Sequence, residues 1–136
     1  MIKPIMKSEF FLRLPSEDAG PDDAATGRDL LDTLHEHERE CVGLAANMIG
    51  VRKRIICVKD GNRTLLMYNP QILEQVNAYQ TSEGCLSLIG ERPCTRYRRI
   101  KVEYLDENFV HRIKNFSGYT AEIIQHEIDH CNGIVI

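Results

Sequence analysis

The chain has 136 residues, the length of one compact domain, since domains commonly run to about 100–200 residues. Its 17 Lys and Arg against 20 Asp and Glu give a formal net charge of −3, which is the wrong sign for a protein that binds phosphate backbones. No apolar run approaches the roughly 20 residues of a membrane span, and no signal peptide is recognisable. We therefore expect a single domain over residues 1–136, with neither a nucleic-acid nor a membrane partner.

The cysteines bear on the cellular compartment. There are 5 of them, an odd number with no paired framework, as is usual where thiols stay reduced. A cytoplasmic protein is the expectation that follows.

The hydrophobic pattern gives the order of the elements. Leu30, Leu31 and Leu34 form an apolar stripe among charged neighbours, which predicts a first helix at about residues 23–39. Runs rich in β-branched and apolar residues, separated by turn sequences, predict antiparallel strands at residues 54–59, 64–68, 98–104 and 109–115.

A second helix is predicted at the end of the chain. Ser117 is a suitable N-cap and Asn132-Gly133 a common helix stop. Between them, Ala121, Ile124 and Ile128 recur at spacings of three and four, so one helix face should pack on the sheet. These elements indicate an α+β fold in which antiparallel or mixed β-sheets surround a central C-terminal helix, with one N-terminal helix.

The C-terminal helix carries an H-E-x-x-H sequence at residues 126–130. Two histidines four positions apart differ by about 40° in direction, so His126 and His130 can bind one metal ion from the same side. Glu127 lies beside the ion without having to bind it. The alternative is a helix that merely happens to be rich in His and Glu.

Catalytic metal sites of the zinc type normally use three protein ligands and leave one position for water. Cys131 points about 100° away from His130, so the third ligand must lie upstream. The candidates by residue type are His35, His37, His111, the acidic residues and the other cysteines. His35 and His37 are about 200° apart on a helix, and we interpret them as part of a solvated face.

Cys85 is the most suitable of these candidates because the glycine before it allows close backbone approach and its thiolate is a soft ligand. The sequences at residues 43–46, 83–87 and 125–130 together resemble the three signature motifs of the peptide deformylases, in the same order and spacing. The resemblance extends over residues 42–133.

The resemblance implies a metal bound by Cys85, His126 and His130, with Fe(II) the expected ion and Ni(II) or Zn(II) the alternatives. It implies hydrolysis of the formyl group from N-formylmethionyl peptides, in which hydroxide on the metal attacks and Glu127 is the general acid and base. The attack leaves a negative charge on the oxygen of the formyl carbon. In the family, this oxygen is stabilised by a glutamine side chain and by the backbone N–H at the position of Leu86.

This chain has Met48 where the family has that glutamine, and Cys41 in the place of the first glycine of the motif. A thioether cannot donate a hydrogen bond, and losing one such donor costs about 10²–10³ in rate. Asn47 is one residue away but should face the other side of an extended segment. The alternative is therefore a weakened deformylase-like protein that binds metal or peptide. A short zinc protease is a third, less favoured reading.

The resemblance also implies where the substrate lies. The peptide adds as a strand beside Val42, Gly43 and Gly84, and its methionine enters an apolar pocket walled by Val42 and Ile123. Glu122 occupies a position that is commonly apolar or basic in the family, so its carboxylate would change the pocket rim. The ribosome is a further partner, but the chain continues only three residues past Gly133, without the extension by which some members dock there.

A basic stretch remains at residues 96–101. Arg96, Arg98, Arg99 and Lys101 are best explained as charges on the open side of a strand.

Overall fold

The strands form a single sheet. A computed structural model describes residues 1–136 and arranges five strands in the order β1-β2-β3-β4-β5, with every neighbouring pair antiparallel. The strands are β1 (Gly43–Ala45), β2 (Ile55–Asp60), β3 (Arg63–Glu83), β4 (Arg92–Leu105) and β5 (His111–Ser117). Each strand pairs with the next along the chain, so β1 and β5 are the edges.

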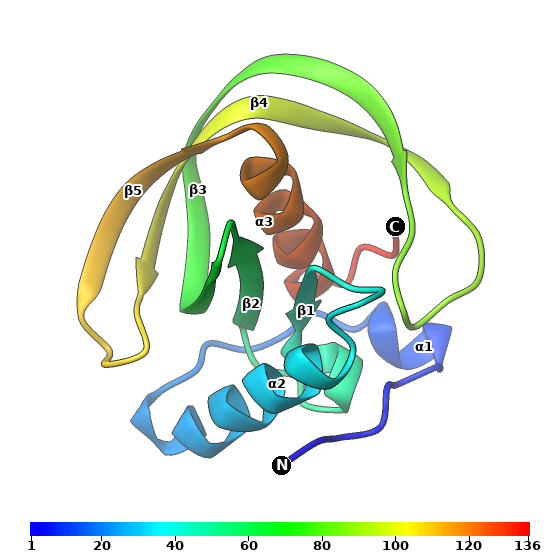
Figure 1. The fold of residues 1–136 in the computed structure, drawn as a ribbon, viewed down its shortest axis with the longest axis vertical. Coiled ribbons are helices and arrows are strands. Elements are labelled where there is room, and N and C mark those ends of the chain that lie inside the picture. The colour runs from blue at the N-terminus through cyan, green and yellow to red at the C-terminus, as the bar shows by residue number, and fades with distance from the viewer.

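Three helices accompany the sheet, α1 (Glu9–Leu12), α2 (Ala24–Glu36) and α3 (Gly118–Cys131), with 3₁₀ turns at Pro21–Asp23 and Ala46–Ile49. The long strands β3 and β4 arch over α3, while β1 and β2 lie on its other side (Figure 1). The α+β fold with a C-terminal helix held inside the sheet is thus confirmed. None of the helices has the length and apolar character needed to cross a membrane.

The helix boundaries agree with the sequence apart from two differences. Ser117 is the N-cap residue of α3, and Gly133 follows its end with φ 75°, where a side chain would also collide with the backbone of Arg13. The first long helix stops at Glu36 rather than near residue 39, because residues 37–40 form a turn. The single-turn helix α1, capped by Ser8, was not predicted.

The predicted strand at residues 64–68 is only the first part of β3, which has 21 residues. Asn69 and Asn77 adopt positive φ angles, and the pairing with β4 is irregular near residues 68–74. Beyond Tyr68 the strand is mostly exposed, so it shows no hydrophobic alternation. The Asn69 side chain bonds to both backbone groups of Ala19, which fixes the chain where β3 bends.

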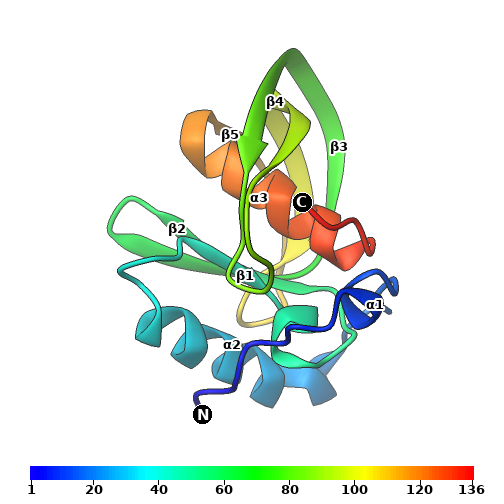
Figure 2. The same ribbon diagram turned by 90° about the vertical axis from the view of Figure 1, so that its right-hand side faces the viewer.

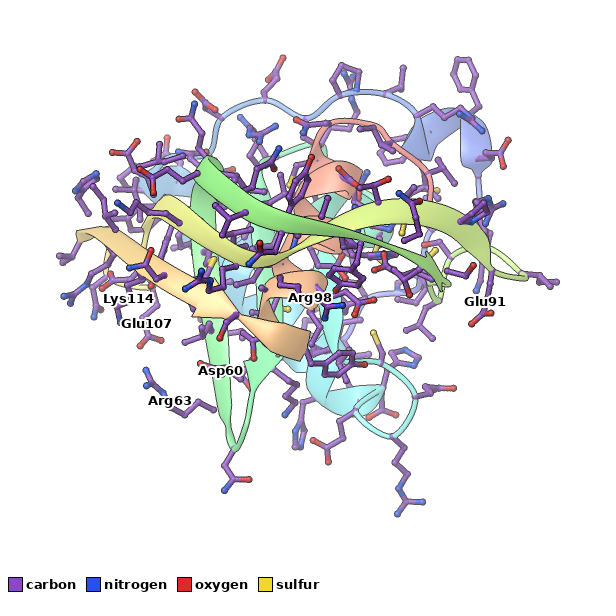
Figure 3. All side chains as sticks on the ribbon, turned by 90° about the horizontal axis from the view of Figure 1, so that it is seen from above. Asp60, Arg63, Glu91, Arg98, Glu107 and Lys114 are labelled. Atoms are coloured by element: carbon purple, nitrogen blue, oxygen red, sulfur yellow. The ribbon has the colours of Figure 1, made fainter.

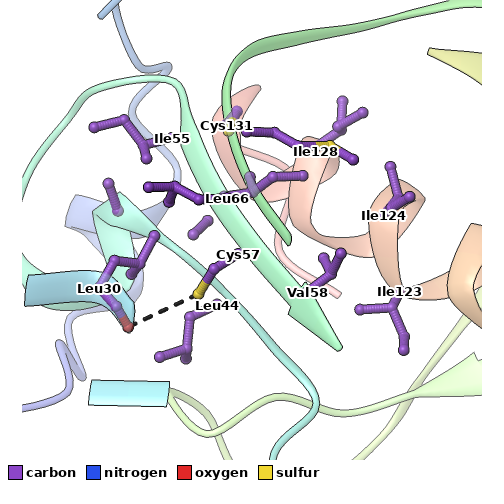
Figure 4. Packing of buried hydrophobic residues seen from close by; sticks show 14 of the residues in the cluster. Leu30, Leu44, Ile55, Cys57, Val58, Leu66, Ile123, Ile124, Ile128 and Cys131 are labelled. Carbon is purple, nitrogen blue, oxygen red and sulfur yellow. Dashed lines mark hydrogen bonds between the residues drawn. The ribbon is translucent and has the colours of Figure 1, made fainter. Parts of the chain in front are cut away.

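The core lies between α3, α2 and the first strands. Figure 4 shows Ile124 and Ile128 of α3 on the side of β2 where Val58 lies, with Cys57 and Leu30 of α2 on the other side. The predicted apolar face of α3 is therefore buried, and the Cys57 thiol donates to the Leu30 carbonyl at 3.8 Å. This packing fixes α3 relative to β1 and β2.

Candidate metal centre

His126 and His130 face each other in the interior. They are 7% and 0% exposed, and their Nε2 atoms lie 3.3 Å apart. Two metal–nitrogen bonds of about 2.05 Å at a tetrahedral angle would separate the nitrogens by about 3.3 Å. Burial, followed by the charge of His126, lowers the pKa of His130 to about 3, so this imidazole is neutral. The pair has the spacing that a single metal ion requires.

Glu83, the last residue of β3, orients the first of these histidines. His126 Nδ1 donates to Glu83 Oε1 at 2.8 Å, which leaves the Nε2 lone pair facing His130. Burial alone would lower the pKa of His126, but this hydrogen bond and the charge of Glu127 raise it. A carboxylate behind a histidine ligand is the usual way proteins hold such a ring in position.

Arg96 of β4 completes this arrangement. Its guanidinium bonds to Glu83 and to Asp129, each at 2.7 Å, and the residue is only 4% exposed. Burial opposes the ionised form of Glu83, but the bonds from His126 and Arg96 prevail and lower its pKa. The interpretation of Arg96 as a charge on the open side of a strand is wrong. The sequence contains a signal, because Arg96 lies four residues, two strand repeats, before the buried Ile100 and so shares its face.

Glu127 is buried beside the histidines. Donor atoms of His126, Glu127 and His130 all lie within 4.8 Å of one another. Burial raises the pKa of Glu127 to about 7, since the carboxylate is removed from water. Its Oε1 and the Nδ1 of His130 are buried with no hydrogen-bond partner. Unpartnered buried polar atoms are uncommon, and that of Glu127, beside the facing Nε2 atoms, marks a site that fits a further bound group.

A cavity of about 470 Å³ opens next to this centre. Its lining residues come from β1, from the turn after β1, from residues 84–91 between β3 and β4, and from α3. Figure 2 shows the β3–β4 connection descending beside β1. The predicted site residues that line it are Val42, Gly43, Met48, Gly84, Cys85, Leu86, Ile123, His126 and Glu127. His130 is the only predicted site residue that does not line the cavity, because it is fully buried.

Cys85 occupies a different place from the histidines. It lines the cavity, but its Sγ is not among the donor atoms that lie within 4.8 Å of one another, where Glu127 is the third group. The structure thus brings together two of the three predicted ligands and puts the third in the same cavity. The role of Cys85 as a ligand stays a prediction.

Met48 and Asn47 belong to the 3₁₀ turn Ala46–Ile49, so the prediction of an extended segment here is wrong. Both side chains are 1% exposed, and Met48 lines the cavity. The Asn47 amide instead donates to the His130 carbonyl at 2.9 Å. Asn47 therefore supports the end of α3, and the thioether of Met48 faces the site.

Comparison with known proteins agrees with this geometry. The sequence model of the family described as polypeptide deformylase matches residues 6–136. The chain is 52% identical to a peptide deformylase of Clostridium beijerinckii over 136 residues, all of both chains. It is 38% identical over 110 residues to peptide deformylase 1 of Clostridium perfringens, covering 79% of this chain and 74% of that one.

Solved structures show the same fold. A peptide deformylase from Thermotoga maritima superposes with a TM-score of 0.89 at 28% identity, covering 99% of this chain and 95% of that one. A class I type b enzyme from Acinetobacter baumannii with Met-Ala-Ser bound gives a TM-score of 0.87 at 31% identity, covering 99% and 97%. With its fold and its family motifs both matched along almost its whole length, the chain belongs to the peptide deformylase family.

Proposed function

We propose that this protein hydrolyses N-formylmethionyl peptides to formate and a free N-terminal methionine. The observation that carries the proposal is the pair of buried imidazoles 3.3 Å apart, with the buried carboxylate of Glu127 beside them, at the wall of a cavity. Family membership and a relative with bound Met-Ala-Ser support the same substrate class.

We propose Cys85, His126 and His130 as the metal ligands, with Fe(II) the first choice and Ni(II) or Zn(II) as alternatives. A thiolate and two imidazoles suit such ions. When bound, the ion would polarise the formyl oxygen and make a water molecule acidic enough to react at neutral pH. We prefer Cys85 to Glu127 as the third ligand because it leaves Glu127 free to transfer protons.

Glu127 would transfer the proton from the attacking water to the departing amine. Its pKa of about 7 lets the carboxylate accept a proton from water as the water oxygen bonds to the formyl carbon. The same proton then passes to the amide nitrogen as the carbon–nitrogen bond breaks. Formate and a free amine result, and Glu127 is regenerated as the carboxylate.

Backbone groups would hold the peptide. β1 is an edge strand, so an added strand could pair beside Val42 and Gly43 once the Cys41 thiol, which donates to the Gly43 carbonyl at 2.9 Å, turns aside; Gly84 lines the same cavity. The walls formed by Val42 and Ile123 would receive the methionine side chain. Leu86 lines the cavity and its N–H forms no backbone hydrogen bond, so it can donate to the negative oxygen.

Formate release tests this function. Protein purified without oxygen and analysed for its metal content should release formate from formyl-Met-Ala-Ser, and treatment with a chelator should abolish the release. Metal-loaded protein that releases no formate would reject the proposal.

A specific observation favours a second candidate, a metal- and peptide-binding protein with weak catalysis. Met48 lines the cavity without a hydrogen-bond donor, and Asn47 is engaged elsewhere. On this reading Met48→Gln should raise kcat by about 10- to 100-fold while the metal content stays the same. An unchanged or lower kcat would show that another donor already serves the oxyanion.

The substrate class also suggests where the protein acts. Formylated chains emerge at ribosomes in the cytoplasm. We propose that the protein acts in this compartment, on the N-terminal ends of newly made peptides.

A further inference from the structure

Carboxylates dominate the charge of the cavity. Its lining includes Glu40, Glu83, Glu91, Glu122 and Glu127, and neither a lysine nor an arginine. Three of these are accounted for, because Glu83 bonds to Arg96 and His126, Glu40 lies 3.1 Å from His37, and Glu127 belongs to the metal centre. Glu91 and Glu122 remain.

Glu122 projects from α3 into the cavity without a cationic partner. Its one hydrogen bond comes from the Tyr79 hydroxyl at 3.3 Å. The guanidinium of Arg98 lies over the Tyr79 ring, 4.6 Å from its centre, and forms no ion pair with Glu122. The neighbouring Glu83 carboxylate raises the pKa of Glu122, because two carboxylates so close oppose each other's ionisation. A cation brought in by a ligand would relieve this opposition.

Glu91 approaches from a second element, the connection between β3 and β4. It is exposed, forms no ion pair, and its Cγ lies 3.7 Å from where a side chain on Gly84 would begin. Gly84 is one of the positions proposed to contact the peptide backbone. Glu91 lies at the end of the β3–β4 arch (Figure 3), and its contact with Gly84 places it beside the proposed path of the substrate.

The cavity holds a second sign that it receives a ligand, the buried and unpartnered Oε1 of Glu127. We infer that Glu122 and Glu91 select peptides carrying Lys or Arg in one of the two residues that follow the formylmethionine. The inference rests on the proposed function for its substrate class, and adds a charge preference to it.

The preference for cationic peptides should be modest in size and sensitive to salt. Both carboxylates are at least partly exposed, so the gain in kcat/KM from one cationic side chain should be modest, about 2- to 10-fold. It should also shrink at about 1 M salt, where charges are screened beyond about 3 Å.

The test compares peptides that differ only in charge. Formyl-Met-Lys-Ser is measured against the same peptide with acetyl-lysine, and formyl-Met-Ser-Lys against its acetylated form. We expect the free lysine to be preferred in at least one pair. The preference should fall towards unity in Glu122→Gln and Glu91→Gln, and persist in the control Glu107→Gln. Glu107 is exposed, without an ion pair, and lies at the other end of the sheet (Figure 3).

Equal kcat/KM within both pairs, or a preference unchanged in both variants, would overturn the inference. Glu91→Gln alters an exposed side chain, so it keeps the test valid even if Glu122→Gln folds poorly. If no peptide releases formate, the proposed function fails, and calorimetry with Met-Lys-Ser and its acetyl-lysine form decides the charge preference. Tighter binding of the free lysine peptide would support the selection, and equal affinities would reject it.

Discussion

Gly43 of β1 packs closely against Ile123 and Glu127 of α3. A Cβ added there would lie 2.7 Å from Ile123 Cγ2 and 2.9 Å from Glu127 Oε2. Ordinary contacts are about 3.4–4 Å, so Gly43→Ala must push β1 and α3 apart by about 0.5–1 Å or turn the Glu127 carboxylate away. Overpacking of this size costs about 1–3 kcal/mol, and a displacement of about 1 Å at a catalytic group can cost about 10²-fold in rate.

The assay measures kcat for formate release together with thermal unfolding. Gly43→Ala should lower kcat by about 10- to 100-fold and Tm by roughly 3–10 °C. The matched control is Gly20→Ala, since a side chain at Gly20 meets no atom within 4 Å. If Gly43→Ala kept the kcat and Tm of the parent protein, the close approach of β1 to Glu127 would be wrong.

Three further predictions concern the groups around the centre. Arg96→Met removes a buried cation that pairs with Glu83 and Asp129, so urea denaturation should show a loss of about 3–5 kcal/mol in the free energy of unfolding; a loss below about 1 kcal/mol would contradict the buried network. Glu127→Gln should lower kcat by about 10²–10⁴ while elemental analysis finds the same metal content, whereas loss of the metal would identify Glu127 as a ligand. Removing the metal with a chelator should lower Tm, by an amount equivalent to about 4 kcal/mol if the free metal had been at 1,000 times its Kd, and adding Ni(II) back should restore it; an unchanged Tm would mean that no metal is bound in the folded state.

The two long helices, α2 and α3, could be predicted from the sequence because their signals are local. The spacing of Ala121, Ile124 and Ile128 identifies the buried face of α3, and Gly133 identifies its end. Most of β3 could not be predicted in this way. After Tyr68 its residues are mostly exposed, and pairing with β4 rather than burial holds them extended.

In the candidate site too, the residues of a local motif could be predicted, whereas contacts between distant residues could not. The H-E-x-x-H sequence shows His126 and His130 directly, since one helical turn brings them together. The contact of His126 with Glu83 and the link from Arg96 to Asp129 join residues 43 and 33 positions apart, and no periodic pattern reveals such pairs. Only the even spacing of four residues between Arg96 and Ile100 in the strand indicates that the Arg96 side chain points inward.

The identity of the third metal ligand is the central claim, because it decides whether Glu127 is free to transfer protons. X-ray absorption at the metal edge of protein purified without oxygen measures it directly. We predict one sulfur neighbour at about 2.3 Å and two imidazole nitrogens at about 2.0–2.1 Å, with the sulfur signal lost in Cys85→Ser. A first shell of nitrogen and oxygen alone would contradict the account and assign the third position to Glu127.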